Sequence, residues 1–130
     1  MLDGMSFFAL ASKRLDWLAA RQKVISENVA NANTPDFLAK DVAGFESMLA
    51  GTQSGMATTN ARHISTGSGG NGGPRVMTDV AAWERSIDGN TVVLEQQTVK
   101  AAEVSESYRL AAQLYRKGHD LLTLSVTGQR

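Results

Sequence analysis

The eight residues Asn28–Pro35, which read NVANANTP, determine where the first structural element of this chain ends. Proline disfavours helical geometry in the residue before it, so a helix that reaches this stretch should stop by Thr34. Three asparagines within six positions are unusual inside a helix, because their side-chain amides compete for backbone hydrogen bonds. The sequence therefore predicts a helix over residues 1–34 and a separate segment over residues 35–50.

Upstream of the asparagines, apolar residues recur with the period of a helix. The stripe advances in alternating steps of three and four residues, which keeps it on one helix face. A strict repeat of this kind favours left-handed, coiled-coil-like packing against another helix. The stripe consists of Phe8, Ala11, Leu15, Leu18, Gln22, Ile25, Val29 and Ala32.

A second long helix is predicted at the other end of the chain, over residues 91–130. Asp88-Gly89-Asn90 is a turn signal, and Asn90 or Thr91 is suited to cap the helix that follows. Gly118 indicates either a kink or a close approach of another element. The apolar stripe consists of Leu94, Gln97, Ala101, Val104, Tyr108, Ala111, Tyr115, Gly118 and Leu122, and Leu110, Leu114, Leu121 and Leu124 widen it.

The middle of the chain has a different composition. Residues 51–75 contain no acidic side chain but hold seven of the twelve glycines, so we expect a flexible loop there. Residues 76–90 should form a segment that ends in a turn, with a short strand or extended stretch at 76–87. The expected fold class is therefore all-α: two long amphipathic helices pack as a coiled-coil-like pair, and a flexible glycine-rich middle joins them.

The composition excludes several classes of protein. The 130 residues carry thirteen basic and thirteen acidic side chains, which argues against binding nucleic acid through a basic surface. Without cysteine there is no disulfide framework and no thiolate zinc site. The N-terminal stretch lacks a basic leader ahead of an apolar run, so we expect no cleaved signal peptide.

Two long helices cannot bury all of this apolar surface by pairing with each other. Long heptad patterns mark association between chains more often than they mark a monomeric core. We therefore expect assembly with copies of the same chain or with other partners. A monomeric helical hairpin with the middle folded over it is the alternative.

Motifs for catalysis or cofactor binding are weak. Gly67–Gly72 matches the GxGxxG pattern by letter, but the strand and helix that a dinucleotide site requires on either side are not convincing. His63 and His119 lack the spacing of metal ligands, and His119 suits a position near a helix C-terminus. We therefore expect no enzyme activity, no cofactor, no metal and no small-molecule substrate.

The asparagines of the Asn28–Pro35 stretch allow two interpretations. One is helix termination, because Asn tolerates a left-handed backbone and satisfies free carbonyls; this accounts for Asn33 better than for Asn28 and Asn31. In the other, Asn28 and Asn31 share a helix face and hydrogen-bond a neighbouring backbone, which would fix the register of docking between subunits. The sequence alone leaves both interpretations open.

The stretch Ser26–Phe37 closely resembles the N-terminal motif of the bacterial flagellar axial proteins, which form the rod and the hook. Within that family, the nearest resemblance is to proximal rod proteins of the FlgB type, although Gln96-Gln97-Thr98 departs from the second acid and the methionine that are usual there. The segments that carry the narrower resemblance are Ala39–Val42 followed by Phe45-Glu46 and Leu49, then Asp88–Asn90 followed by Val93–Glu95, and finally Tyr108 in a long last helix.

This resemblance implies a structural subunit of the proximal rod of the flagellar basal body. Such a subunit assembles with itself and with related proteins into a tubular drive shaft, which transmits motor torque and encloses the export channel. It leaves the cytoplasm through the type III export apparatus and joins the rod in the periplasm. The partners implied are other rod proteins, copies of itself, the ring-to-rod adaptor and membrane-ring proteins.

The residues expected at the assembly interface come from both helices and from the motif between them. We expect Asn28 and Asn31 to set the register. The apolar stripes and the motif should contribute Leu15, Leu18, Ile25, Val29, Thr34, Pro35, Phe37, Val104, Tyr108, Ala111, Tyr115 and Leu122. A rival hypothesis is a coiled-coil adaptor or secretion chaperone that forms a small oligomer.

Overall fold

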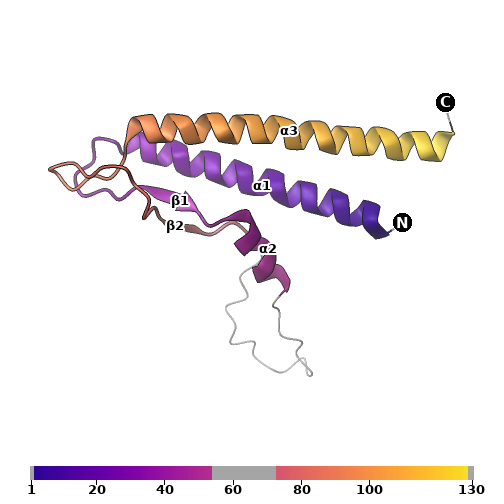
Figure 1. Ribbon diagram of the computed structural model, residues 1–130, viewed down its shortest axis with the longest axis horizontal. Coiled ribbons are helices and arrows are strands. Elements are labelled where there is room, and N and C mark those ends of the chain that lie inside the picture. The colour runs from indigo at the N-terminus through magenta and orange to yellow at the C-terminus, as the bar shows by residue number, and fades with distance from the viewer. Residues whose placement is uncertain (1, 54–72, 129–130) are drawn as a thin grey trace, which may run out of the picture.

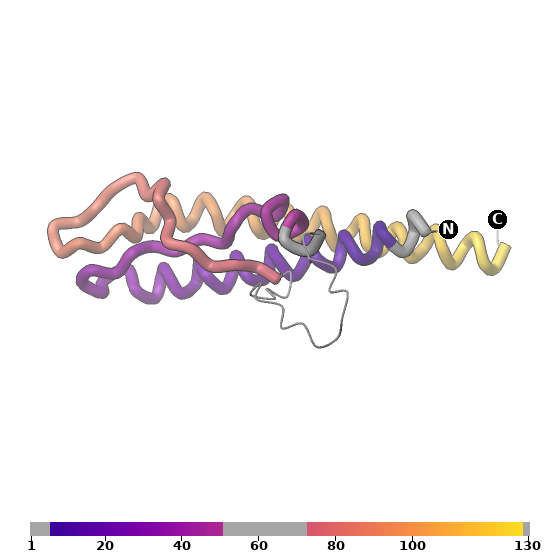
Figure 2. Tube along the Cα trace, turned by 90° about the horizontal axis from the view of Figure 1, so that it is seen from below, coloured from indigo at the N-terminus to yellow at the C-terminus, as the bar shows by residue number. Residues whose placement is uncertain are grey.

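Two long helices dominate the computed structural model, which describes residues 2–53 and 73–128. Helix α1 spans Leu2–Ala30 and helix α3 spans Leu94–Thr127, and they run antiparallel along each other (Figure 1). Both chain termini therefore lie at one end of an elongated molecule, and the chain connecting to α3 turns at the other end (Figure 2). The expected all-α class with paired terminal helices is confirmed. Neither long helix, nor any other in the described ranges, is apolar enough over a sufficient length to cross a membrane.

Helix α1 ends at Ala30, four residues before the limit that Pro35 sets. Residues 31–36 form successive turns, in which the Ala32 N–H donates to the Val29 carbonyl at 3.2 Å and the Thr34 N–H to the Asn31 carbonyl at 3.0 Å. The left-handed residue is Asp36, with φ of 57°, rather than Asn33. The asparagine-rich motif is therefore a turn that follows the helix, since these local bonds replace the helical ones before Pro35 is reached.

The connection between the long helices contains more regular structure than its composition suggests. Strand β1 (Lys40–Val42) pairs antiparallel with strand β2 (Val76–Thr78), with Asp41 opposite Met77. Helix α2 covers Phe45–Gln53. It begins in the segment expected at 35–50 and ends in the first residues of the loop expected at 51–75. The extended stretch expected at 76–87 is a strand only at its beginning. Residues 54–72, with His63 and the Gly67–Gly72 pattern, lie outside the described residues.

The core lies where α1 is covered on two sides. Figure 1 shows α3 on one side of α1 and the strands with α2 on the other. Side chains from all of these layers meet in one cluster, and full burial of each large apolar side chain contributes about 1.5–3 kcal/mol. Its buried members are Trp17, Leu18, Val24, Ile25, Val42, Met48, Val104 and Ala111.

At the end of the molecule where the termini lie, α3 passes close to the first turns of α1. A Cβ at Gly118 would lie 2.8 Å from the Phe7 ring, so this position permits a close approach. The Phe8 ring lies 5.4 Å from that of Tyr115 and 4.6 Å from that of His119. Of the two roles considered for Gly118, close approach is thus the observed one, within a helix that continues without a break.

Helix α3 begins at Leu94, later than the Asn90 or Thr91 start expected from the turn signal. Its N-cap position is occupied by Val93, and no side chain of the described residues caps it. Its C-terminus follows a common pattern, since Gly128 is left-handed with φ of 62° and its N–H donates to the Leu124 carbonyl at 3.0 Å. Asn90 and Thr91 have other partners.

Candidate functional site

Asn28 is fully buried and holds three elements together. Its side-chain oxygen accepts from the Lys40 N–H at 3.0 Å, and its Nδ2 donates to the Lys40 carbonyl at 2.7 Å. The same Nδ2 donates to Oε1 of Gln97 on α3 at 3.0 Å. An amide in this position reproduces the hydrogen bonds of a strand neighbour, so α1 fixes where β1 begins and how α3 is aligned with it.

Gln97 completes this contact but leaves one polar atom unpaired. The side chain is 1% exposed, and its Nε2 finds no hydrogen-bond partner in the part of the chain that the structure describes. An unpaired N–H of this kind costs about 1–3 kcal/mol when buried. Gln96, its neighbour, is also buried but is paired, because its Nε2 donates to the Ala81 carbonyl at 3.0 Å.

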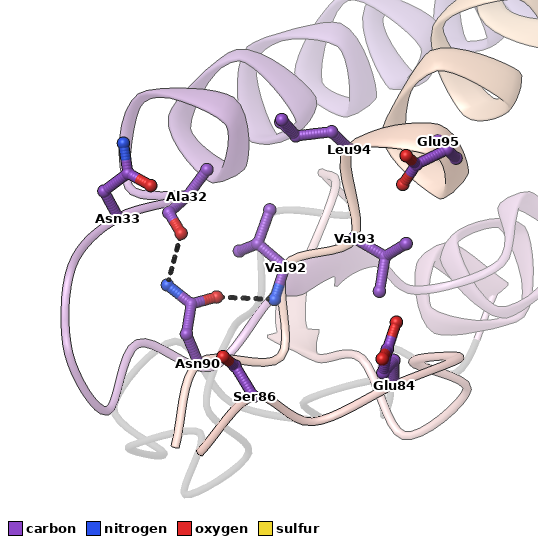
Figure 3. Close-up of a pocket in the computed structure, with 9 residues that line it drawn as sticks. All are labelled: Ala32, Asn33, Glu84, Ser86, Asn90, Val92, Val93, Leu94 and Glu95. Carbon is purple, nitrogen blue, oxygen red and sulfur yellow. Dashed lines mark hydrogen bonds between the residues drawn. The ribbon is translucent and has the colours of Figure 1, made fainter. Parts of the chain in front are cut away.

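The side chain of Asn90 binds the turn that follows α1 and does not cap α3. Its Nδ2 donates to the carbonyls of Asn31, Ala32 and Thr34 at 2.9, 3.0 and 2.8 Å. Its Oδ1 accepts from the Val92 N–H at 2.7 Å. Figure 3 shows the amide directed at the Ala32 carbonyl on one side and at Val92 on the other. One buried side chain thereby binds three carbonyls of the turn that follows α1, in addition to the local bonds of that turn.

Two backbone features bring Asn90 to this position. Gly89 has φ of 85°, a conformation that side chains with a Cβ rarely adopt. A Cβ there would also clash with Oδ1 of Asp36, whose own N–H donates to the Asp88 carbonyl at 2.9 Å. Thr91 then accepts from the Ala39 N–H at 2.7 Å through its hydroxyl oxygen. The turn at 88–91 is thus fitted against the turn at 31–36.

A charge cluster ties the strands to both long helices. Asp41 on β1 pairs with Arg21 of α1 at 3.1 Å and with Lys100 of α3 at 3.0 Å, and Lys100 also pairs with Asp79. Burial alone would raise the pKa of Asp41, but hydrogen bonds from Arg21, Lys100 and the Val42 N–H outweigh it and lower that pKa. Burial alone would lower the pKa of Lys100, but its bonds to Asp79 and Asp41 raise it.

These contacts lie on the strand side of the helix pair, and among the described residues a groove on its other side is lined by α1 and α3 alone. On α1 the strand side is marked by Trp17, whose Nε1 donates to the Ala43 carbonyl at 2.7 Å, and by Asn28. The opposite side carries a groove of about 510 Å³ between the helices, which we call the interhelix groove. It is lined by Leu18, Ala19, Gln22, Ala101, Val104, Ser105 and Tyr108.

The sequence of the helix that ends in this turn matches a known family. A family model described as "Flagella basal body rod protein" matches residues 10–37. Flagellar basal body rod protein FlgB of Agrobacterium fabrum is 34% identical over 135 residues, which cover 96% of each chain. The chain belongs to the FlgB family of flagellar basal body rod proteins. The Yersinia enterocolitica relative is 32% identical over 117 residues, and the Cereibacter sphaeroides relative is 29% identical over 110 residues.

These relatives align over most of their own length as well, 82% for the Yersinia enterocolitica protein and 84% for the Cereibacter sphaeroides protein. Membership in the FlgB family makes this chain a structural component of the flagellar basal body rod. It is a structural family and not a family of enzymes. Within the described residues, no group of three or more His, Asp or Glu side chains is placed to hold a metal ion.

The structure distributes the expected interface residues over three environments. The first set is buried within the chain itself, the second is half-buried, and the third is exposed. The buried set is Leu18, Ile25, Asn28, Val104 and Ala111. The half-buried set is Leu15, Asn31, Phe37 and Tyr115. The exposed set is Val29, Thr34, Pro35, Tyr108 and Leu122, and these side chains are accessible to a neighbouring subunit.

Asn28 and Asn31 have different environments despite their spacing. The side chain of Asn28 hydrogen-bonds the backbone of Lys40 in its own chain. Asn31 makes local contacts: its Nδ2 donates to the Glu27 carbonyl at 2.8 Å and its Oδ1 accepts from the Thr34 hydroxyl at 3.1 Å. The structure therefore gives Asn31 a part in helix termination and Asn28 a part in internal alignment.

Three residues that matter for this arrangement were not among the residues expected at the site, and a fourth, Asn90, was expected in another role. Trp17 and Asp41 join α1 to the strands, Lys100 joins α3 to them, and Asn90 binds the turn after α1. Trp17 lies off the apolar stripe of α1 and Asp41 lies outside the helices, so helical periodicity does not detect either residue. The turn signal did identify Asn90, but the side chain binds the preceding helix end instead of capping the following one.

Proposed function

We propose that this rod component is a subunit of the proximal rod, which self-assembles and co-assembles into a tubular drive shaft around the export channel. The pair of α1 and α3 would form the wall of that tube. The partners would be other rod proteins, copies of the same chain, the ring-to-rod adaptor and membrane-ring proteins. The subunit would reach the periplasm through the export apparatus.

The observation that carries this proposal is the open face of the helix pair. The strands and α2 lie against one side of the helix pair, whereas the interhelix groove is lined by α1 and α3 alone among the described residues. Apolar side chains extend this face toward the end of the pair where α1 stops and α3 begins, since Val29 is 48% exposed and Leu94 is 50% exposed. The small side chains at its centre, Ala19 and Ala101, allow another helix to approach closely. A surface of this kind suits lateral packing between elongated subunits.

Charge insertion on this face tests the proposal. Val29→Glu and Tyr108→Glu each place a carboxylate where a neighbouring subunit would pack, and both side chains are about half exposed, so the fold of the single chain should survive. Each variant would replace the natural gene, with swimming and the presence of rods in isolated basal bodies as the readouts. We expect both variants to lose motility and rods.

Ser12→Glu is the matched control, because Ser12 is an exposed residue of α1 that does not line the interhelix groove. It should leave motility unchanged. Circular dichroism of the purified variants should show the same helicity in all three. Normal swimming by both Val29→Glu and Tyr108→Glu would contradict lateral packing through this face. A stable dimer in solution that needs this face would favour the adaptor or chaperone hypothesis instead.

A further inference from the structure

The small sheet has a free edge along β2. The Ala43 N–H donates to the Arg75 carbonyl at 2.7 Å, so the backbone groups of Arg75 face β1. Backbone groups in an antiparallel ladder alternate in direction from one residue to the next. With the register observed, the backbone groups of Met77 also face β1, whereas those of Val76 and Thr78 point away from it.

The edge of β1 at Lys40 is already completed, because Asn28 binds both the N–H and the carbonyl of Lys40. The edge of β2 has no such neighbour. In the part of the chain that the structure describes, the outward backbone groups of Val76 and Thr78 find no hydrogen-bond partner. Val76 and Met77 are 52% and 55% exposed, and Figure 1 shows β2 on the side of β1 that faces away from the helix pair. An accessible strand edge of this kind pairs readily with another strand.

We propose that β2 pairs antiparallel with β2 of a second copy of this chain, about a two-fold axis that passes beside Met77. In this register, Val76 of one copy lies opposite Thr78 of the other. The outward N–H and carbonyl groups of these two residues then form the hydrogen bonds of an antiparallel ladder. Met77 lies opposite Met77 of the second copy, so that these exposed apolar side chains cover each other.

The charges of the strands agree with this register. The charged residues of the two strands and of the positions next to them are Lys40, Asp41, Arg75 and Asp79. Arg75 is exposed and makes no ion pair with a described residue, and in the proposed register it lies opposite Asp79 of the second copy. Asp79 retains its own ion pair with Lys100. Lys40 and Asp41 are separated from the second copy by β2, so no like charges lie opposite each other across the contact.

A two-fold contact of this kind closes as a dimer and cannot be repeated along a polar rod. It is therefore a property of the free subunit and goes beyond the proposed function. Pairing through β2 protects the strand edge from non-specific association before assembly. Because a contact through such short strands is small and therefore weak, the subunits separate again when they are incorporated. The interhelix groove lies on α1 and α3 and stays accessible in this dimer.

A single cysteine tests the register directly, since the natural chain contains none. Met77→Cys places a thiol directly opposite the same thiol of the second copy, at a separation that suits a disulfide. The control is Val80→Cys, which is 96% exposed but three residues further along the chain, so its copies lie far apart in the dimer. In the oxidised, purified chain, we expect Met77→Cys to form covalent dimers about tenfold faster than Val80→Cys. Equal rates would overturn the proposal.

A proline at the edge tests the hydrogen bonds. Thr78→Pro removes an N–H that points away from β1, so the ladder between β1 and β2 should remain. Added to Met77→Cys, it should reduce the rate of dimer formation to that of Val80→Cys, with helicity by circular dichroism unchanged. An unchanged rate would contradict pairing through this edge.

Charges at the two-fold axis decide the question if the proline variant does not fold. Met77→Lys and Met77→Glu should each stay monomeric in sedimentation equilibrium, because like charges oppose each other at the axis, whereas an equal mixture of the two should form dimers. A mixture that associates no better than either variant alone would overturn the proposal. All of these measurements use the purified subunit, so a negative result leaves the rod proposal, which the motility tests address, intact.

Discussion

The side-chain amide of Asn28 donates to Oε1 of Gln97 at 3.0 Å, inside the interface between α1 and α3. The two residues are 69 positions apart, and both are buried. The remaining hydrogen bonds of Asn28 go to the backbone of Lys40, so this one contact aligns the two long helices and the strand between them. A buried polar contact in an apolar interface specifies register, because any sliding of the helices leaves its groups unpaired.

Replacement of Asn28 should therefore destabilise the free subunit. Asn28→Ala leaves the Lys40 N–H, the Lys40 carbonyl and Oε1 of Gln97 without their partner. Because buried unpaired groups each cost about 1–3 kcal/mol, we expect a loss of about 3 kcal/mol in the free energy of unfolding. Urea unfolding followed by circular dichroism measures it. Asn33→Ala, at an exposed position of the same motif, should change stability by less than about 0.5 kcal/mol.

The contact with Gln97 can be isolated by a double-mutant cycle. If Asn28 and Gln97 stabilise the fold through their hydrogen bond, the loss in Asn28→Ala/Gln97→Ala should be about 1 kcal/mol smaller than the sum of the two single losses. Strictly additive losses would show that the two amides act independently.

The charge cluster predicts a specific dependence of stability on pH. Asp41 has a pKa lowered from its ordinary value of 3.8, so its contribution is fully present well above pH 3.8 and is lost as the pH falls through the folded-state pKa. Lys100 has a pKa raised from 10.5, so its contribution is fully present below pH 10.5 and is lost as the pH rises through the folded-state pKa. Both contributions to the free energy of unfolding should be constant between the acidic range in which Asp41 becomes protonated and the alkaline range in which Lys100 loses its proton.

Asp41→Asn separates this effect from general acid denaturation. The variant should lose about 2 kcal/mol at neutral pH, because Lys100 and Arg21 lose a partly buried partner. Its unfolding free energy should then fall less steeply below pH 3.8 than that of the natural chain. Equal slopes in both proteins at low pH would show that Asp41 is not among the groups responsible.

Much of the architecture follows from periodicity in the sequence. The stripes of α1 and α3 predicted two long paired helices, and Leu18, Ile25, Val104 and Ala111 are indeed in the core. Periodicity detects these elements because a helix repeats one environment over many residues. Gly118 was recognised as a candidate for close approach for a related reason, since glycine stands out in a helical pattern.

The parts that could not be predicted depend on pairing between distant residues. Strands β1 and β2 are three residues long each, and their pairing brings Lys40 opposite Thr78 across the connection. Strands this short have no alternation from which a register could be read. The roles of Asn28 and Asn31 likewise depend on what lies beside the helix, and only the placement of Lys40 and Gln97 distinguishes the buried amide from the half-buried one.

Gly89 should be one of the least replaceable residues of the chain. Gly89→Ala introduces a Cβ at a φ of 85° and drives it into Oδ1 of Asp36, so both the backbone and the neighbouring turn oppose it. We expect a loss of at least about 2 kcal/mol in unfolding free energy. Gly44→Ala is the control, because no described atom lies within 4 Å of the Cβ it would add and its stability should change little.

A second substitution distinguishes the two causes of this loss. Asp36→Gly removes the side chain that meets the new Cβ and suits the positive φ of that position. The variant Gly89→Ala/Asp36→Gly should therefore recover part of the stability lost in Gly89→Ala, with the remainder due to the backbone of residue 89. If the double variant is no more stable than Gly89→Ala, the whole loss in unfolding free energy is due to backbone strain at residue 89.

Asn90 provides the sharpest test of the turn after α1, because the two roles considered for it respond differently to aspartate. An N-cap tolerates Asp as well as Asn, since only a side-chain oxygen is required. In the structure, however, Nδ2 of Asn90 donates to the carbonyls of Asn31, Ala32 and Thr34. An aspartate at this position would place a carboxylate oxygen against those three carbonyls, so Asn90→Asp should be at least as destabilising as Asn90→Ala, by about 2–3 kcal/mol in urea unfolding. A neutral Asn90→Asp would instead show that the residue acts only as an acceptor for the Val92 N–H.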